Sequence, residues 1–218
     1  MAEKQNPKNK KLTVLVSSTV YDYEELLNRI YTILTLFGYE VWMSHKGTMP
    51  VFSDHSAFEN CIAATEKCDL FLGIITPQYG SGVDDKSGLS ITHQELKKAI
   101  ELKKPRWLLA HDHVVFARTL LTNLGYEGKA GRKKLSLKKN PVMADLRVID
   151  MYEEAILSAK PLLERQGNWV QKFSNDADTM LFATAQFSRY QEVEAFIKEN
   201  FQDPDHLSQK IHETGGRP

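Results

Sequence analysis

The sequence predicts an α/β fold of three layers, with helices on both faces of a parallel sheet. Short apolar runs typical of strands alternate along the chain with segments whose apolar residues recur at helical spacing. These runs are continuously apolar, which indicates strands covered on both faces. Because a helix separates successive strands, right-handed crossovers are expected, and a flavodoxin-like topology is the simplest arrangement.

The first elements can be assigned in order along the chain. LTVLVS (Leu12–Ser17) is the first predicted strand, and a helix follows from Tyr23, with Asp22 as a plausible N-cap and Gly38 after its end. The next predicted elements are the strand Tyr39–Ser44, the short helix Ala57–Lys67 and the strand Asp69–Thr76. The last of these, DLFLGIIT, is the most apolar strand and is expected at the centre of the sheet.

A glycine- and serine-rich loop then leads into a helix that contains Glu95 and ends before Pro105. The strand Arg106–Ala110 and a helix over Val114–Gly125 follow. These elements complete a predicted α/β domain over residues 11–125.

Beyond this domain the predicted pattern is mainly helical. Residues 126–144 form a predicted basic loop, in which Gly128–Pro141 carries six Lys and Arg residues. Such charge blocks are usually solvated, and phosphate contact is the alternative. Residues 145–202 are expected to form a helical extension packed on the domain, with a short edge strand in Asp145–Ile156 and a long helix over Met180–Phe201. Residues 1–10 and 203–218 are expected to be flexible tails.

The composition disfavours several classes of protein. Lys and Arg together number 28 and so do Asp and Glu, so no net field attracts nucleic acid or an anionic membrane. Cys61 and Cys68 are too few for a disulfide framework and are expected to be reduced. No segment approaches the roughly 18 consecutive apolar residues of a membrane span. A soluble cytoplasmic protein without membrane or nucleic-acid partners is therefore expected.

Ligands of an open parallel sheet bind beyond the carboxyl ends of its strands. The residues predicted at these ends carry hydroxyl groups, aromatic rings or flexible backbone, which suit a ribose, a base or a phosphate: Ser17, Ser18, Thr19, Tyr21, Asp22, Trp42, Ser44, Tyr79, Gly80, Ser81 and Gly82. For Ser17 and Ser18, helix capping and turn formation explain the residue type equally well.

Absent motifs narrow the chemistry further. The sequence contains no GxxxxGK[ST], GxGxxG or GxSxG motif, which disfavours P-loop hydrolases, dinucleotide oxidoreductases and serine hydrolases. The histidines include one close pair, His111 and His113, but they form no array with the spacing of metal ligands. No metal and no cofactor are expected.

Glu95 is the candidate catalytic residue, and it has a competing structural explanation. THQE (Thr92–Glu95) fits a capping box, with threonine at the N-cap and glutamate at N3. Glu95 also lies beside Leu96 and four residues before Ala99, at the margin of the apolar face. Burial would raise its pKa and the helix N-terminus would lower it, and we expect it to be ionised at neutral pH.

Three stretches, VLVSSTVYD, DLFLGIITPQYGSG and GLSITHQELKKAIELKKP, together resemble the bacterial TIR-like domains of a family long catalogued as a domain of unknown function. The resemblance covers roughly Lys11–Leu124. The positions that carry it are Ser17, Ser18, Thr19, Asp22, Tyr79, Gly80, Ser90, Glu95, Ala99, Lys104 and Pro105.

The resemblance implies an activity and a setting. TIR enzymes hydrolyse or cyclise NAD+ with a glutamate at the start of this helix, and Glu95 is the matching position. NAD+ would then be a substrate, Ser90 would belong to the binding site, and a homo-oligomer or partner protein and a role in bacterial defence would be expected. The chemistry is consistent, because a carboxylate stabilises the positive charge that develops on the ribose.

Two other functions remain open. Ile91, Thr92 and His93 stand where active TIR enzymes commonly carry a tryptophan-cysteine pair. This difference favours a catalytically silent TIR-like module that binds a nucleotide signal or a protein. Glycosyl transfer is the third hypothesis, because nucleoside deoxyribosyltransferases are a related α/β family in which a helix presents a glutamate to the sugar.

Overall fold

A computed structural model describes residues 11–80, 82–83, 87–138, 142–143, 145–189 and 192. Its sheet has five parallel strands in the order β2-β1-β3-β4-β5, which is the flavodoxin-like order. The strands are β1 (Thr13–Ser18), β2 (Glu40–Trp42), β3 (Leu70–Ile75), β4 (Arg106–His111) and β5 (Val170–Phe173). The predicted α/β fold and the central place of β3 are confirmed.

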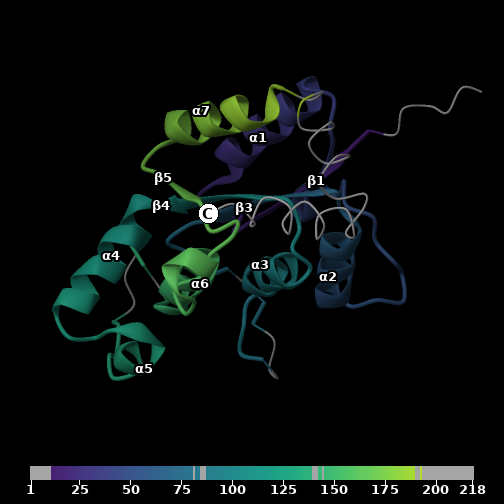
Figure 1. Cartoon of the computed structure of the whole chain (residues 1–218). Helices are drawn as coiled ribbons and strands as arrows, with labels where there is room; N and C mark the ends of the chain where they lie inside the picture. Colours follow the sequence, from purple (N-terminus) through teal and green to yellow (C-terminus); the bar gives the residue numbers. More distant parts are fainter. Residues whose placement is uncertain are drawn as a thin grey trace, which may run out of the picture.

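Helices cover the two faces of the sheet in the order that the crossovers require (Figure 1). On one face lie α1 (Glu24–Leu36) and α7 (Asp176–Phe187), and on the other lie α2 (Ala57–Lys67), α3 (Ile91–Glu101) and α6 (Arg147–Ala155). The remaining helical segments are α4 (Asp112–Asn123), α5 (Gly128–Arg132) and the single turns η1 (Ser44–Lys46) and η2 (Leu162–Glu164). In the described part of the chain, no helix is both long and apolar enough to cross a membrane.

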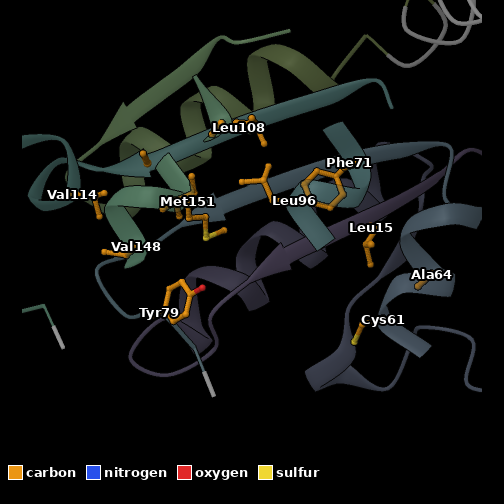
Figure 2. Packing of buried hydrophobic residues seen from close by; sticks show 14 of the residues in the cluster. Leu15, Cys61, Ala64, Phe71, Tyr79, Leu96, Leu108, Val114, Val148 and Met151 are labelled. Carbon is orange, nitrogen blue, oxygen red and sulfur yellow. The ribbon is translucent and has the colours of Figure 1, made fainter. Parts of the chain in front are cut away.

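The core consists of two layers, one on each side of the sheet. Alternate residues of β1 point to opposite sides, so Leu15 packs with the α2, α3 and α6 layer and Val14 with the α1 and α7 layer. Figure 2 shows the first layer, in which Leu96 of α3 and Phe71 of β3 lie between helix and sheet. All six residues of β3 are buried, which explains its continuous apolar run.

The first helix does not begin as predicted. Asp22 is not its N-cap, since the cap is Tyr23 and no side chain accepts a hydrogen bond there. Asp22 instead adopts a left-handed conformation with φ of 67°. Aspartate tolerates this conformation better than most residues. The role of Asp22 in the turn between β1 and α1 is therefore to adopt this left-handed backbone conformation.

The C-terminal part adds a strand that the sequence analysis placed elsewhere. Residues Asp145–Ile156 contain no strand and form α6, whereas the edge strand is β5, which pairs in parallel with β4. The predicted helix over Met180–Phe201 begins earlier, as α7, and ends at Phe187. Ser188 and Arg189 are not helical, and the later residues lie outside the described part, apart from 192. The predicted tails, 1–10 and 203–218, also lie outside it.

The basic segment is more ordered than a solvated loop. Residues 128–132 form α5, and Arg132 is buried between Asp150 and Glu153 of α6, with ion-pair distances of 2.5 Å to each. Arg118 of α4 lies 3.0 Å from the same Glu153. For these residues the prediction of a loop is wrong, because carboxylates of α6 neutralise the charge that suggested solvent exposure.

Candidate active site at the carboxyl edge of the sheet

A pocket of about 490 Å³ opens beyond the carboxyl end of β1. The strands on either side of β1 are β2 and β3, so the chain leaves β1 at the point where the strand order reverses. Ligands of open α/β sheets bind at this kind of point. The walls come from the end of β1, from η1 and the loop after it, and from α2 and α3. The polar residues that line the pocket are Ser17, Ser18, Thr19, Tyr21, Ser44, His45, Asn60, Cys61, Thr92 and Glu95.

Glu95 lies in the wall of this pocket as a buried carboxyl group. Its exposed fraction is 5%, although α3 begins only four residues earlier. The hydroxyl of Ser17 donates a hydrogen bond of 2.5 Å to Oε2, and the thiol of Cys61 donates to the same carboxyl group. Residues from β1, α2 and α3 therefore meet at one carboxyl group.

Burial has the largest effect on the pKa of Glu95. It raises the pKa to about 7, even though the hydrogen bonds from Ser17 and Cys61 act in the opposite direction. The carboxyl group therefore titrates near neutral pH, so the prediction that it is fully ionised there is wrong. The thiol of Cys61 is a donor and no nucleophile, because burial and then the charge of Glu95 raise its pKa to about 12.

The capping-box explanation of Glu95 is wrong. Ser90 is the N-cap of α3, and its hydroxyl accepts a hydrogen bond of 3.3 Å from the backbone N–H of His93. Glu95 lies in the second turn, too far along the helix to reach the cap. A capping box does occur at the start of α2, between Ser56 and Glu59.

The end of β1 and the loop after β3 form the rim of the pocket. Ser18 donates to the carbonyl oxygen of Thr19, and the hydroxyl of Thr19 donates at 2.8 Å to the carbonyl oxygen of Gln78. Gly80 has φ of 94°, a conformation that favours glycine, and a Cβ there would lie 3.5 Å from Oγ1 of Thr19. The chain thus approaches the pocket closely at Gly80.

A second cavity of about 410 Å³ adjoins the first and shares Thr19, Tyr21 and Gly80 with it. Asp22 lines this second cavity, as do Tyr79 and Arg147. Asp145 holds the guanidinium of Arg147 at 2.5 Å. The two cavities offer room for an elongated ligand on both sides of Thr19 and Gly80.

Five of the predicted binding residues in the described part do not line the first pocket: Asp22 and Tyr79 line the second cavity, and Trp42, Gly82 and Ser90 line neither. Ser81 lies outside the described part. Trp42 is a core residue, 7% exposed, whose indole N–H donates to Glu40. Tyr79 is 4% exposed and its hydroxyl contacts His93, so its ring is no open platform for a base. Ser90 is fully buried as the cap of α3. Packing and capping use the side chains of Trp42, Tyr79 and Ser90, and their contact with a ligand stays a prediction.

Sequence reasoning missed other parts of the wall. Cys61 appeared as a packed thiol only, yet it touches the candidate carboxyl group. Asn60 is buried and holds the loop before α2, because its side chain bonds the backbone of Phe52, His55 and Ser56. Tyr21, in contrast, was predicted from its place after the first strand; it is 61% exposed and lines both cavities, so its ring is open to a ligand. A polar residue inside an otherwise apolar helical face, such as Asn60, was the available signal.

The histidine pair lies apart from this carboxyl group, at the end of β4. Candidate ligand atoms of His111, Asp112 and His113 lie within 4.8 Å of one another. Nδ1 of His111, however, already accepts the backbone N–H of His113 and thereby caps α4. The described residues thus contain one group close enough to hold a metal ion, and helix capping uses one of its nitrogen atoms.

Comparison with known proteins identifies a family. A family model described as "Domain of unknown function (DUF4062)" matches residues 13–214. No curated protein matches the chain.

Proposed function

The chain belongs to the DUF4062 family of domains of unknown function, and from its own site we propose that it cleaves the bond between nicotinamide and ribose in NAD+. The observation that supports this most is the buried carboxyl group of Glu95 in a pocket at the strand-order reversal. A resemblance to TIR-like domains also supports it. The reaction would give nicotinamide and ADP-ribose, or a cyclic form of ADP-ribose.

The chemistry assigns one main task to Glu95. As the bond from ribose C1′ to nicotinamide breaks, its electron pair leaves with the nicotinamide and positive charge develops on the ribose. A carboxylate next to the ribose stabilises this charge, most strongly where water is excluded. In hydrolysis, water adds to C1′ and releases one proton. Glu95 would act as a carboxylate, held in place by Ser17 and Cys61.

The proposal is tested by incubating concentrated protein with NAD+ and identifying the products. Glu95→Ala and Glu95→Gln are the test variants, and Glu59→Gln is the control, since Glu59 belongs to the capping box of α2 and is exposed. We expect turnover in the wild type and the control, and its loss in both Glu95 variants. Turnover that survives in both Glu95 variants would contradict the proposal.

A second candidate is glycosyl transfer from a nucleoside, and the charge of the site favours it. Among the described residues that line the two cavities, Arg147 is the one Lys or Arg, and Asp145 neutralises it. The diphosphate of NAD+ would therefore meet hydroxyl groups and backbone rather than a free cation. Thermal denaturation with NAD+ and with a deoxynucleoside separates the candidates, because a ligand stabilises the protein that binds it.

Binding without turnover would identify a third outcome. A protein that NAD+ stabilises against heat, but that releases no nicotinamide at any protein concentration, would be a silent module that binds a nucleotide signal. The same two measurements therefore distinguish the NAD+ enzyme, the glycosyl transferase and the binding module.

A further inference from the structure

A chain of contacts connects α6 to the start of α3, outside the glutamate pocket; it is buried at Tyr79 and His93, and the side chain of its α6 member, Glu154, is 37% exposed. The hydroxyl of Tyr79 lies 2.7 Å from Nδ1 of His93 in α3. Nε2 of the same ring lies 3.1 Å from Oε2 of Glu154 in α6. His93 is 1% exposed and Tyr79 4%, so neither side chain has water as an alternative partner. Unpaired polar groups are costly in such surroundings.

One assignment of hydrogen atoms is consistent with the contacts of this chain. The hydroxyl of Tyr79 accepts the backbone N–H of Ser90 at 3.4 Å, so its own proton is available to Nδ1 of His93. In a neutral ring Nε2 then carries the hydrogen and faces Glu154. That N–H is not aligned for a hydrogen bond, so the contact with Glu154 is mainly electrostatic.

A second contact joins α6 to the same loop. The guanidinium of Arg147, in the first turn of α6, lies 4.6 Å from the ring centre of Tyr79 and donates to the carbonyl oxygen of Gly88. Helices α3 and α6 lie side by side beneath the sheet (Figure 1). Arg147 and Glu154 therefore hold the β3–α3 loop and the first turn of α3 from the two ends of α6.

We propose that Tyr79, His93 and Glu154 are positioning residues through which α6 holds the first turns of α3, and with them the carboxyl group of Glu95, in place. Ser90 begins α3, His93 lies in its first turn, and Glu95 follows two residues later. A shift of this turn would move Glu95 away from Ser17 and Cys61, which belong to other elements. The consequence for catalysis rests on the proposed function, whereas the positioning does not.

The two cysteines provide a readout that needs no enzymatic activity. Cys61 contacts Glu95, and Cys68 is 1% exposed at the end of α2. A thiol reagent labels a buried cysteine when the structure around it opens, so the two labelling rates report separately on the pocket and on the core. Tyr79→Phe removes the hydroxyl and keeps the ring beneath Arg147. Glu154→Gln removes the charge and keeps the shape.

The labelling rates are compared at one pH in the wild type and in three variants. We expect Tyr79→Phe to accelerate labelling of Cys61 by at least about fivefold, the change in opening equilibrium that the loss of one buried hydrogen bond produces. Glu154→Gln should act in the same direction and less strongly, and Cys68 should keep its rate in both. Lys97→Gln is the control, since Lys97 lies 3.9 Å from Glu154 but outside the chain of contacts. It should change neither rate.

Either of two results would overturn the positioning role. Equal acceleration at both cysteines would mean that the variants destabilise the whole fold, and unchanged rates at both would mean that the contacts hold nothing. If the wild type cleaves NAD+, Tyr79→Phe should lower kcat more than it raises KM. If it does not, the labelling result still tests the positioning, so the two proposals fail separately.

Discussion

At Glu95, stability and the proposed function place opposite demands on one buried carboxyl group. Among the described residues, Ser17 and Cys61 donate to it, and the removal of a carboxylate from water is costly without stronger compensation. The fold therefore favours the protonated form, while the proposed chemistry needs the ionised form. A group with opposed requirements of this kind is typical of functional sites.

This opposition makes the stability of the protein depend on pH. The pKa of Glu95 is raised from 4.5 to about 7, so the protonated form contributes stability that is present below pH 4.5 and is lost as pH rises through 7. We expect the free energy of unfolding of the wild type, relative to Glu95→Gln, to fall by about 3 kcal/mol between pH 4.5 and pH 8. Urea unfolding of both proteins at several pH values measures this difference.

The comparison with Glu95→Gln cancels the contributions of other titrating groups, because both proteins contain them. A constant difference between the two proteins across this range would mean that the carboxyl group is solvated, with an ordinary pKa.

Ser17 affects the pKa of the same carboxyl group. Its hydroxyl donates to Oε2, and this hydrogen bond lowers the pKa of Glu95. In Ser17→Ala the pKa of Glu95 should rise further, so the pH window of the stability difference should move to higher pH. If NAD+ is cleaved, the midpoint of the rise of kcat/KM with pH should move in the same direction. Ser18→Ala is the control, since the Ser18 hydroxyl donates to a backbone carbonyl.

At the scale of the element, the sequence predicted strands better than the boundaries of helices. The apolar runs identified β1 to β4, because burial on both faces leaves a continuous signal. The start of α3 was misplaced because Ser90 and Thr92 are both good N-caps, and only tertiary contacts select Ser90. Strand β5 was missed because three of its four residues are not fully buried, so its pattern resembles that of a loop.

The central strand has little room for extra atoms at Gly73. A Cβ there would lie 2.8 Å from Cδ2 of Leu108 and 2.9 Å from Cε1 of Phe71, and both side chains are fully buried. Gly73→Ala should therefore lower the free energy of unfolding by about 1–3 kcal/mol, as overpacked core positions do. Chemical denaturation measures this loss.

A double variant identifies the cause of that loss. Leu108→Val shortens one of the two crowding side chains, so Gly73→Ala should be less destabilising in a Leu108→Val protein than in the wild type. If the free-energy losses of Gly73→Ala and Leu108→Val simply add in the double variant, Leu108 is not the side chain whose crowding makes Gly73→Ala destabilising.

At the scale of the molecule, the C-terminal elements complete the α/β domain. Strand β5 extends the sheet next to β4, Phe173 and Phe187 are buried in the same layer as α1, and the hydroxyl of Tyr39 donates to the carbonyl oxygen of Phe187. Helix α6 also covers the other face and contacts the candidate site. Helix α5, whose Arg132 pairs with Asp150 and Glu153 of α6, belongs to the same folded unit.

The candidate site could be predicted only in part, because some of its contacts depend on how the elements of the whole molecule pack together. Strand ends located Ser17, Ser18, Thr19 and Gly80, because parallel topology brings them to one edge. The second partner of Glu95, Cys61, could not be found in this way. Cys61 comes from a helix, and contacts between helices depend on packing angles that periodicity does not contain.

A single folded unit has a measurable consequence for unfolding. Trp42 and Trp107 report on strands of the sheet, while far-UV circular dichroism reports largely on the helices. If the C-terminal elements belong to the same unit, both signals should follow one transition with the same midpoint in urea. Phe187→Ala should lower the free energy of unfolding by about 3–5 kcal/mol and move both signals together, because Phe187 is fully buried beside Trp107.

Leu181→Ala is the matched control, since Leu181 lies on the same helix with 72% of its surface exposed and should cost less than about 1 kcal/mol. A circular dichroism transition that precedes the fluorescence transition would contradict the single unit. In that case α7 would unfold from an intact sheet, and the loss in Phe187→Ala would appear in the first step alone. Coincident transitions in all three proteins would mean that the layer of α1 and α7 and the layer of the candidate site are stabilised together.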